Sequence, residues 1–350
     1  MKRHVAGIAI ASILVGATGV SAGEPLQAIL ADTPANLISE YGLFPKGPLG
    51  EPAANVVRYD LVTPLFSDHA LKFRAVYVPT GEKIAFEPHE ALRFPVGSAL
   101  IKTFAFPADF RKPGEAIRVI ETRLLLRRPD GWQALAYVWN EDQSDAELKV
   151  AGKKVPVEFV DREGRPVSFT YSVPNRNQCK ACHDLNDEIV PLGPKARNLN
   201  RETDHGGRAF NQLEAWVDRG ILADLAPLAV VERAANWADR SEPLEARARS
   251  WLDVNCGHCH RDGGPASNSG LFLDAGEADP VRLGIGKRPA AAGRGAGDRL
   301  FDIVAGEPDR SILLYRVEST EPGVMMPELG RHLADLDATA LIRAWIASLR

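Results

Sequence analysis

The stretch SEPLEARARSWLDVNCGHCH, residues 241–260, joins a helical pattern to two cysteines and two histidines. Ser241 can cap a helix and Pro243 suits a first turn, so the pattern predicts a helix over 241–255. That helix leads directly into Cys256, Cys259 and His260. The spacing Cys-x-x-Cys-His is specific enough to decide how this part of the chain folds and what it binds.

The same spacing occurs once more, in NQCKACHDL at residues 177–185, and the two motifs hold all four cysteines of the chain. In c-type cytochromes the two thiols bond covalently to the vinyl groups of heme, and the adjacent histidine binds the iron. We therefore expect Cys179, Cys182, Cys256 and Cys259 to attach two molecules of heme c. His183 and His260 are the expected proximal ligands.

Three other uses of paired cysteines fit less well. A zinc site built from both pairs would usually separate them by about 15–20 residues, whereas 73 residues lie between Cys182 and Cys256. Two disulfides or a thiol-redox motif would suit an exported protein. Neither explains why a histidine follows both pairs, so heme attachment is the favoured interpretation.

The second motif is embedded in a longer pattern. A Gly/Pro-rich stretch follows over residues 261–311, then VMMPELG at 324–330, then a closing amphipathic helix. Asp335 or Asp337 can cap this last helix. Its apolar stripe consists of Leu341, Ile342, Trp345, Ile346 and Leu349.

Residues 236–350 thus resemble a class I cytochrome c, in which the first and last helices cross beside the heme. The resemblance implies a methionine before the last helix as the distal iron ligand. We assign Met326, which directly precedes Pro327, with Met325 as the alternative. Thioether ligation would make this the heme of higher potential. His258, between the two cysteines, is expected to face solvent.

The first motif lacks such surroundings. Residues 176–235 form a short segment that contains no methionine, so a heme here must also pack against a neighbouring domain. An open, five-coordinate iron is equally compatible with this segment. Otherwise the candidate sixth ligands are His205, His69, His89 and Lys195.

The region before the motifs has the pattern of β structure. Residues 51–175 hold alternating or continuous apolar runs rich in Val, Ile, Phe and Tyr, separated by turn sequences such as RPDG. The expected fold is therefore an antiparallel β sandwich or barrel, followed by a mainly α-helical c-type cytochrome region. No nucleophile or metal motif stands out in the β part.

The N-terminus predicts export. Residues 1–22 combine a basic start, an apolar run and small residues, which is the layout of a signal peptide cleaved after about Ala22. Residues 23–50 are expected to form an irregular leader. After cleavage no membrane span is expected, which predicts a periplasmic protein. The formal net charge of −4 gives no indication of nucleic-acid binding.

Ordered motifs along the chain resemble a diheme c-type cytochrome family of Gram-negative bacteria. They include TPLFSDHALKFR, FPVGSALIKTF, GWQALAYVWNEDQSDA, PNRNQCKACHD, GPKARNLNR, LDVNCGHCHRDGGPASNSGL and MMPELGR. The resemblance covers about residues 50–350 and implies two covalent hemes in a periplasmic protein. It implies no particular substrate or reaction.

The expected function is single-electron transfer between redox partner proteins. The alternative is a diheme peroxidase-like enzyme in which the first iron stays open, and a third possibility is a binding module in which the β domain recognises a glycan or protein. A basic loop with Lys287, Arg288, Arg294 and Arg299 is a candidate contact for heme propionates or for an acidic partner. It is also compatible with an ordinary solvated surface.

Overall fold

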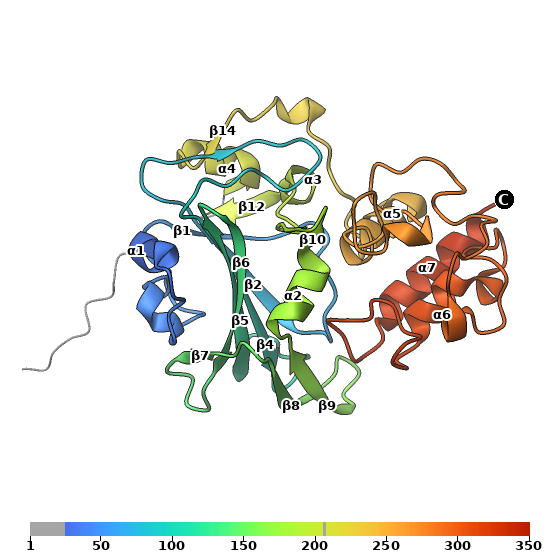
Figure 1. The fold of residues 1–350 in the computed structure, drawn as a ribbon, viewed down its shortest axis with the longest axis horizontal. Coiled ribbons are helices and arrows are strands. Elements are labelled where there is room, and N and C mark those ends of the chain that lie inside the picture. The colour runs from blue at the N-terminus through green and yellow to red at the C-terminus, as the bar shows by residue number, and fades with distance from the viewer. Residues whose placement is uncertain (1–24, 206–207) are drawn as a thin grey trace, which may run out of the picture.

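The computed structural model describes residues 25–205 and 208–350 of the chain. Its largest element is one six-stranded sheet, which Figure 1 shows in blue and green at the centre of the molecule. All neighbouring strands are antiparallel, in the order β1-β2-β4-β5-β6-β7. The strands are β1 (Val56–Tyr59), β2 (Leu71–Tyr77), β4 (Ala99–Pro107), β5 (Ile117–Arg128), β6 (Gly131–Trp139) and β7 (Ala146–Leu148).

Alternation along the strands gives the sheet two different faces. One face buries Ala75, Ile101, Leu124 and Tyr137 beneath the N-terminal segment. That segment forms α1 (Pro25–Leu30) and the 3-10 helix η1 (Ile38–Tyr41), whose apolar side chains are buried in the same cluster. Residues 23–50 were expected to form an irregular leader, but residues 25–43 contain two short helices and contribute buried side chains to this core.

The other face carries two separate apolar clusters. At one end it packs against α3 (Ala196–Leu199) and α4 (Gln212–Asp218), with Trp216 fully buried. At the other end it packs against the hairpin of β8 (Lys153–Val160) and β9 (Pro166–Val173). Between them lies α2 (Arg176–His183), which Figure 1 shows beside β5 and β6 and which contacts β6.

Short pairs of strands complete this half of the molecule. β10 (Asp184–Leu185) pairs with β11 (Glu188–Ile189) directly after α2. β12 (Glu202–His205) pairs with β13 (Arg208–Asn211), and β14 (Leu222–Ala223) lies parallel to β3 (Ile84–Ala85).

The C-terminal part has its own core, built around Trp251, Leu252, Ile342 and Trp345. Its main helices are α5 (Leu244–Asn255), α6 (Ile312–Glu318) and α7 (Leu336–Ser348). The Asp335 carboxylate caps α7 by accepting a hydrogen bond from the Ala338 N–H at 3.1 Å, which confirms the first of the two expected caps. The 3-10 helices are η2 (Leu228–Val230), η3 (Ser267–Ser269), η4 (Gly293–Ala296) and η5 (Pro308–Arg310).

The expected fold class is wrong. Only 23% of the structure is helical, and residues after α5 run mostly through turns and 3-10 segments before α6 begins. The Gly- and Pro-rich composition of 261–311 accounts for this, because such residues disfavour helix interiors. The β part is likewise one open sheet with an added hairpin, and its edge strands β1 and β7 do not meet to close a barrel.

Two local expectations also fail. Ser241 does not cap α5, because its hydroxyl donates to the Asp239 carboxylate at 2.7 Å and the helix begins at Leu244. Pro243 occupies the cap position and leaves the first N–H groups without a side-chain acceptor.

Candidate functional site

Helix α2 presents the first Cys-x-x-Cys-His motif. Asn175 caps the helix by accepting from the Gln178 N–H at 2.9 Å, and the Gln178 side chain accepts from the Asn175 N–H at 3.0 Å. This capping box fixes where the helix begins. Cys179, Cys182 and His183 follow at helical spacings of three and four residues, which place them on one side of the helix.

The His183 ring is held by the backbone of the next strand. Its Nδ1 lies 2.8 Å from the carbonyl oxygen of Val190, so Nδ1 carries the proton and Nε2 is the nitrogen left for a metal. Burial lowers the pKa of His183 to about 4, and Lys102 and Arg123 add to that fall. The ring is thus neutral at neutral pH, which is the form that ligates metals.

The second motif is arranged in the same way. Helix α5 ends at Asn255, and a tight turn follows in which the His260 N–H donates to the Cys256 carbonyl at 2.9 Å. His260 Nδ1 lies 3.2 Å from the carbonyl of Leu271, which again leaves Nε2 available. Both histidines adjacent to a cysteine pair therefore have the orientation that an iron ligand requires.

The four thiols are unpaired with one another. All four cysteines are free, so the structure contains neither of the two disulfides. Burial raises the pKa of Cys256 and Cys259 to about 12 and also raises the pKa of Cys179 and Cys182, so the thiols are protonated at neutral pH. Within residues 25–205 and 208–350, no group of three or more acidic, cysteine or histidine side chains converges as a metal site does. This argues against the four-cysteine zinc site.

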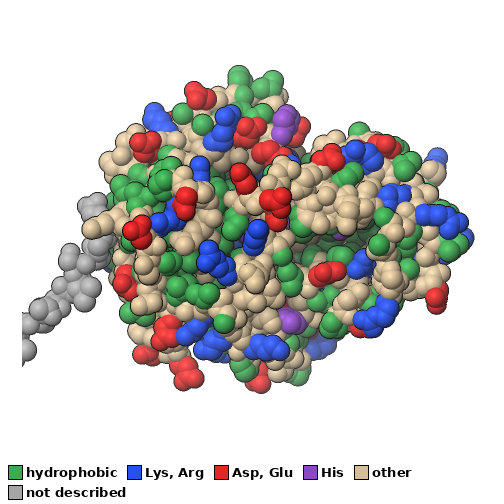
Figure 2. Space-filling view, viewed as in Figure 1, with side chains coloured by type: hydrophobic (Ala, Val, Ile, Leu, Met, Phe, Trp, Pro, Cys, Tyr) green, Lys and Arg blue, Asp and Glu red, His purple; other side chains and the backbone are tan. Residues whose placement is uncertain are grey.

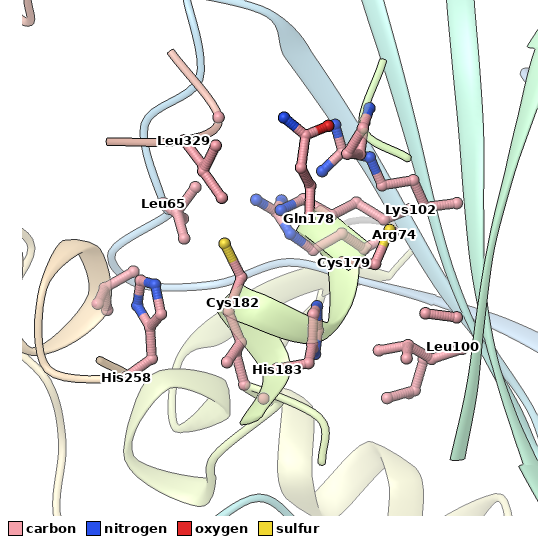
Figure 3. A pocket seen from close by; sticks show the side chains of 18 of the residues that line it. Leu65, Arg74, Leu100, Lys102, Gln178, Cys179, Cys182, His183, His258 and Leu329 are labelled. Atoms are coloured by element: carbon pink, nitrogen blue, oxygen red, sulfur yellow. The ribbon is translucent and has the colours of Figure 1, made fainter. Parts of the chain in front are cut away.

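The first motif opens onto a cavity of about 370 Å³. Its wall combines α2 with strands β2, β4, β5 and β6 and with the loop from Met325 to His332. Figure 3 shows Cys182 and His183 on α2, with Arg74, Leu100 and Lys102 on the strand side and Leu65 and Leu329 beside them. The predicted dependence of this site on a neighbouring domain is consistent with these strand residues in its wall.

The second motif opens onto a larger cavity of about 750 Å³, lined by Cys256, Cys259 and His260. Its opposite wall comes from 289–294, α6 and the segment around Met326. Figure 2 shows that the surface is hollowed between the two parts of the molecule, with hydrophobic side chains on the walls.

Cys182 and His258 line both cavities, and both also line a smaller one of about 90 Å³ between them. The two motifs therefore share a wall. The expectation that His258 faces solvent is wrong, because its Nδ1 is buried and the residue lines the cavities of both motifs. The reason is tertiary, since the cavities that His258 lines are also bounded by Cys182 of α2, far away in the sequence.

The two consecutive methionines line different cavities. Met326 lines the second cavity together with His260, while Met325 lines the first. The Met326 backbone is fixed by its N–H, which donates to the Arg316 carbonyl at 2.9 Å, and by its carbonyl, which accepts from Arg331 Nη2 at 2.8 Å. The geometry therefore keeps Met326 as the candidate distal ligand of the second site.

The candidate sixth ligands of the first site lie in different places. Lys195 lines the first cavity, but its Nζ is 3.9 Å from both Glu90 and Asp253. His69 and His89 are not among the residues that line that cavity, and the side chain of His205 lies outside the described residues. The structure brings His258, Met325 and His332 to the cavity instead.

Three cations of the sheet were missed by the sequence-based interpretation. Arg74, Lys102 and Arg123 line the first cavity. Each is a basic residue next to large apolar residues of a predicted strand, in KFRAVY, ALIKTFAF and ETRLLL. This pattern could have been noticed in the sequence. By contrast, two of the four residues of the basic loop form ion pairs within the protein. Lys287 pairs with Asp302 at 2.9 Å and Arg294 with Glu321 at 2.8 Å.

No family model, no curated protein and no solved structure matches this chain. Among the described residues, no helix has both the length and the apolar character needed to cross a bilayer. The expected signal peptide, residues 1–22, lies outside the described residues.

Proposed function

We propose that the chain is an exported, periplasmic diheme c-type cytochrome that passes single electrons between redox partner proteins. Cys179 and Cys182 would attach one heme and Cys256 and Cys259 the other, each thiol adding its sulfur and its hydrogen across one vinyl group. His183 and His260 would hold the irons through Nε2, and Met326 would complete the second site. A bound heme supplies the one-electron iron couple.

The residues present fit such a group. Each motif lines its own cavity, and volumes of about 370 and 750 Å³ lie in the range of about 300–1,000 Å³ that is common for ligand sites. Each motif histidine has its Nδ1 at a backbone carbonyl. Net addition to a vinyl group uses the sulfur and the hydrogen of each thiol, and all four cysteines are free for it, whereas a zinc site would need four converging thiolates.

The observation that carries the proposal is that the two cavities share Cys182 and His258. A protein that only stored or sensed two separate groups would not need them to adjoin. A shared wall suits transfer of an electron from one group to the other, and the opening of the surface beside it would admit a partner.

The decisive experiment is to express the full chain in a host that matures c-type cytochromes and to measure its intact mass and its oxidised and reduced spectra. Two covalent hemes, both reducible by a small electron donor, are the expected result. A mass without heme would overturn the proposal. A high-spin first heme that reacts with peroxide would favour the peroxidase-like enzyme instead.

A further inference from the structure

Arg74, Lys102 and Arg123 form a row across three adjacent strands. In the sheet register Arg74 of β2 lies directly opposite Lys102 of β4, and Lys102 lies directly opposite Arg123 of β5. Like charges placed directly opposite in a sheet are destabilising. We therefore expect the three cations to be paired with an anion in the functional protein, which offsets the repulsion within the row.

The row also interrupts an apolar surface. On one side of it the same sheet face packs through Val76 and Leu100 into the α4 cluster, and on the other through Phe104 and Val138 into the hairpin cluster. Placing cations between two packed cores costs desolvation. Burial, together with Arg74 and Arg123, lowers the pKa of Lys102 well below its usual range. The lowered pKa reflects the same unfavourable desolvation of the charged form.

Only one of the three cations has a close carboxylate. Glu121 is fully buried and accepts from Arg123 Nε at 3.0 Å and Nη2 at 2.5 Å. The nearest described carboxylate of Arg74 is that of Asp60, at 3.9 Å and largely exposed, and Arg74 Nη2 has no hydrogen-bond partner among the described residues. Arg74 is itself only 7% exposed.

Lys102 is the least compensated member of the row. No carboxylate lies within ion-pairing distance of its Nζ among the described residues, and its nearest aromatic contact is the Phe104 ring, whose centroid is 4.9 Å away. One Glu121 therefore stands against the three cations of the row, an excess of two positive charges. The other Lys, Arg, Asp and Glu residues that line the first cavity are two of each sign, Lys195 and Arg331 against Asp253 and Glu328, and leave this excess unchanged.

These cations share the cavity with the first motif. Arg74, Lys102 and Arg123 line it together with Cys179, Cys182 and His183. Figure 3 shows Arg74 and Lys102 around the same space that Cys182 and His183 of α2 border. A planar group attached to α2 would therefore have the cationic row within the same cavity.

We propose that Arg74 and Lys102, supported by Arg123, bind the two propionate carboxylates of the heme attached at Cys179 and Cys182; this assignment rests on the proposed function. Two carboxylates match the excess of two positive charges. Arginine and lysine donate strong, charge-assisted hydrogen bonds to carboxylates. The row thereby orients the first heme, with its covalent edge on α2 and its acidic edge toward β2 and β4.

The test uses the full chain with both hemes attached and compares Arg74→Gln and Lys102→Gln with Lys72→Gln. Lys72 is the matched control, because it is a half-buried cation on the same face of β2 that does not line the first cavity. Lys102→Arg, which keeps the charge, provides the conservative variant. Spectroelectrochemistry from pH 5 to pH 8 reports each heme separately.

Loss of a cation beside a heme favours the oxidised state, because reduction adds negative charge. We expect Arg74→Gln and Lys102→Gln to change the reduced-to-oxidised ratio of the first heme at fixed applied potential about tenfold toward oxidised, which is about 59 mV for one electron. The potential should also become pH-dependent, since a propionate without its cation is more easily protonated. Lys102→Arg should restore the parent behaviour.

Potentials that match those of Lys72→Gln at every pH would overturn the assignment. So would a change of iron spin state in Lys102→Gln alone, since Lys102 would then be an iron ligand. These results can be told apart from failure of the proposed function. If the chain bound no heme, its intact mass would already show this before any potential is measured. If Lys102→Gln does not fold, Arg74→Gln and Lys102→Arg still decide the question.

Discussion

The two Cys-x-x-Cys-His sites have the same local chemistry but different walls. In both, a helix or helical turn presents two free thiols that line a cavity, and a backbone carbonyl orients the histidine. The first cavity is bounded by strands of the large sheet, whereas the second is bounded by turns and short helices of the C-terminal part. The motif thus indicates which chemical group a site can attach. The surrounding fold determines how tightly that group is enclosed and which charges surround it.

The largest expected effect comes from removing the thiols of one site at a time. Cys179→Ala/Cys182→Ala and Cys256→Ala/Cys259→Ala should each lower the intact mass by one heme. The second pair should also lower stability more, on the order of 3 kcal/mol or about 10 °C in Tm, because turns around an empty cavity of about 750 Å³ have little other support. Equal losses of Tm would contradict the difference between the walls.

Next in size is the loss of the methionine ligand. Met326→Ala should remove the spectroscopic signature of methionine ligation from the second heme and lower its potential by about 0.2 V, a fraction of the roughly 0.8 V that axial ligands span. Met325→Ala is the matched control, since Met325 lines the first cavity. The assignment fails if Met325→Ala removes the signature and Met326→Ala leaves it.

The sequence was sufficient for what depends on local spacing. The two motifs, the cap of α7 by Asp335 and its buried stripe follow from residues a few positions apart. It was insufficient wherever distant segments meet. His258 shares a cavity wall with Cys182 of α2, 76 residues earlier, and the row of Arg74, Lys102 and Arg123 exists only once three strands are in register. The amount of helix was overestimated because the loop over 261–311 forms turns.

The ion pair at the interface between the two regions provides a third test. Arg197 of the first part and Asp253 of α5 form a bidentate pair at 2.8 Å with both side chains 8% exposed. Asp253→Asn leaves the buried Arg197 guanidinium without a charged partner, and we expect the free energy of unfolding to fall by about 3 kcal/mol. Glu90→Gln is the control, because the Glu90 side chain is 46% exposed and its ion pairs should contribute about 1 kcal/mol or less.

The pH dependence of that pair has a definite sign. Although burial alone would raise the pKa of Asp253, Lys195 and Arg197 lower it below the usual 3.8. The stability that Asp253 contributes is therefore present above pH 3.8 and is lost as pH falls toward its folded pKa. Chemical denaturation at pH 7 and pH 3 should show the wild type and Asp253→Asn converging in acid. A constant difference would mean that the pair contributes through shape and not through charge.

The smallest expected effect concerns Asp68, which also joins the two regions. One of its carboxylate oxygens, Oδ1, accepts from the N–H groups of His332 and Leu333 at 2.6 and 2.7 Å. Burial raises the pKa of Asp68 above 3.8, although both N–H groups and the charges of His332 and His69 lower it. Between pH 3.8 and the folded pKa, the folded state keeps a proton that the unfolded state has released, so stability falls as pH rises.

Asp68→Asn keeps an oxygen for both N–H groups and removes the buried charge. It should therefore raise the unfolding free energy at pH 7 by less than about 1 kcal/mol and flatten the stability profile just above pH 3.8. Asp68→Ala removes the acceptor and should lower stability by about 1 kcal/mol, because two partly buried N–H groups lose their partner. If Asp68→Asn were instead less stable than the wild type at pH 7, the charge of the Asp68 carboxylate would itself stabilise the contact with His332 and Leu333. The two proposed heme sites would then be linked electrostatically at this contact.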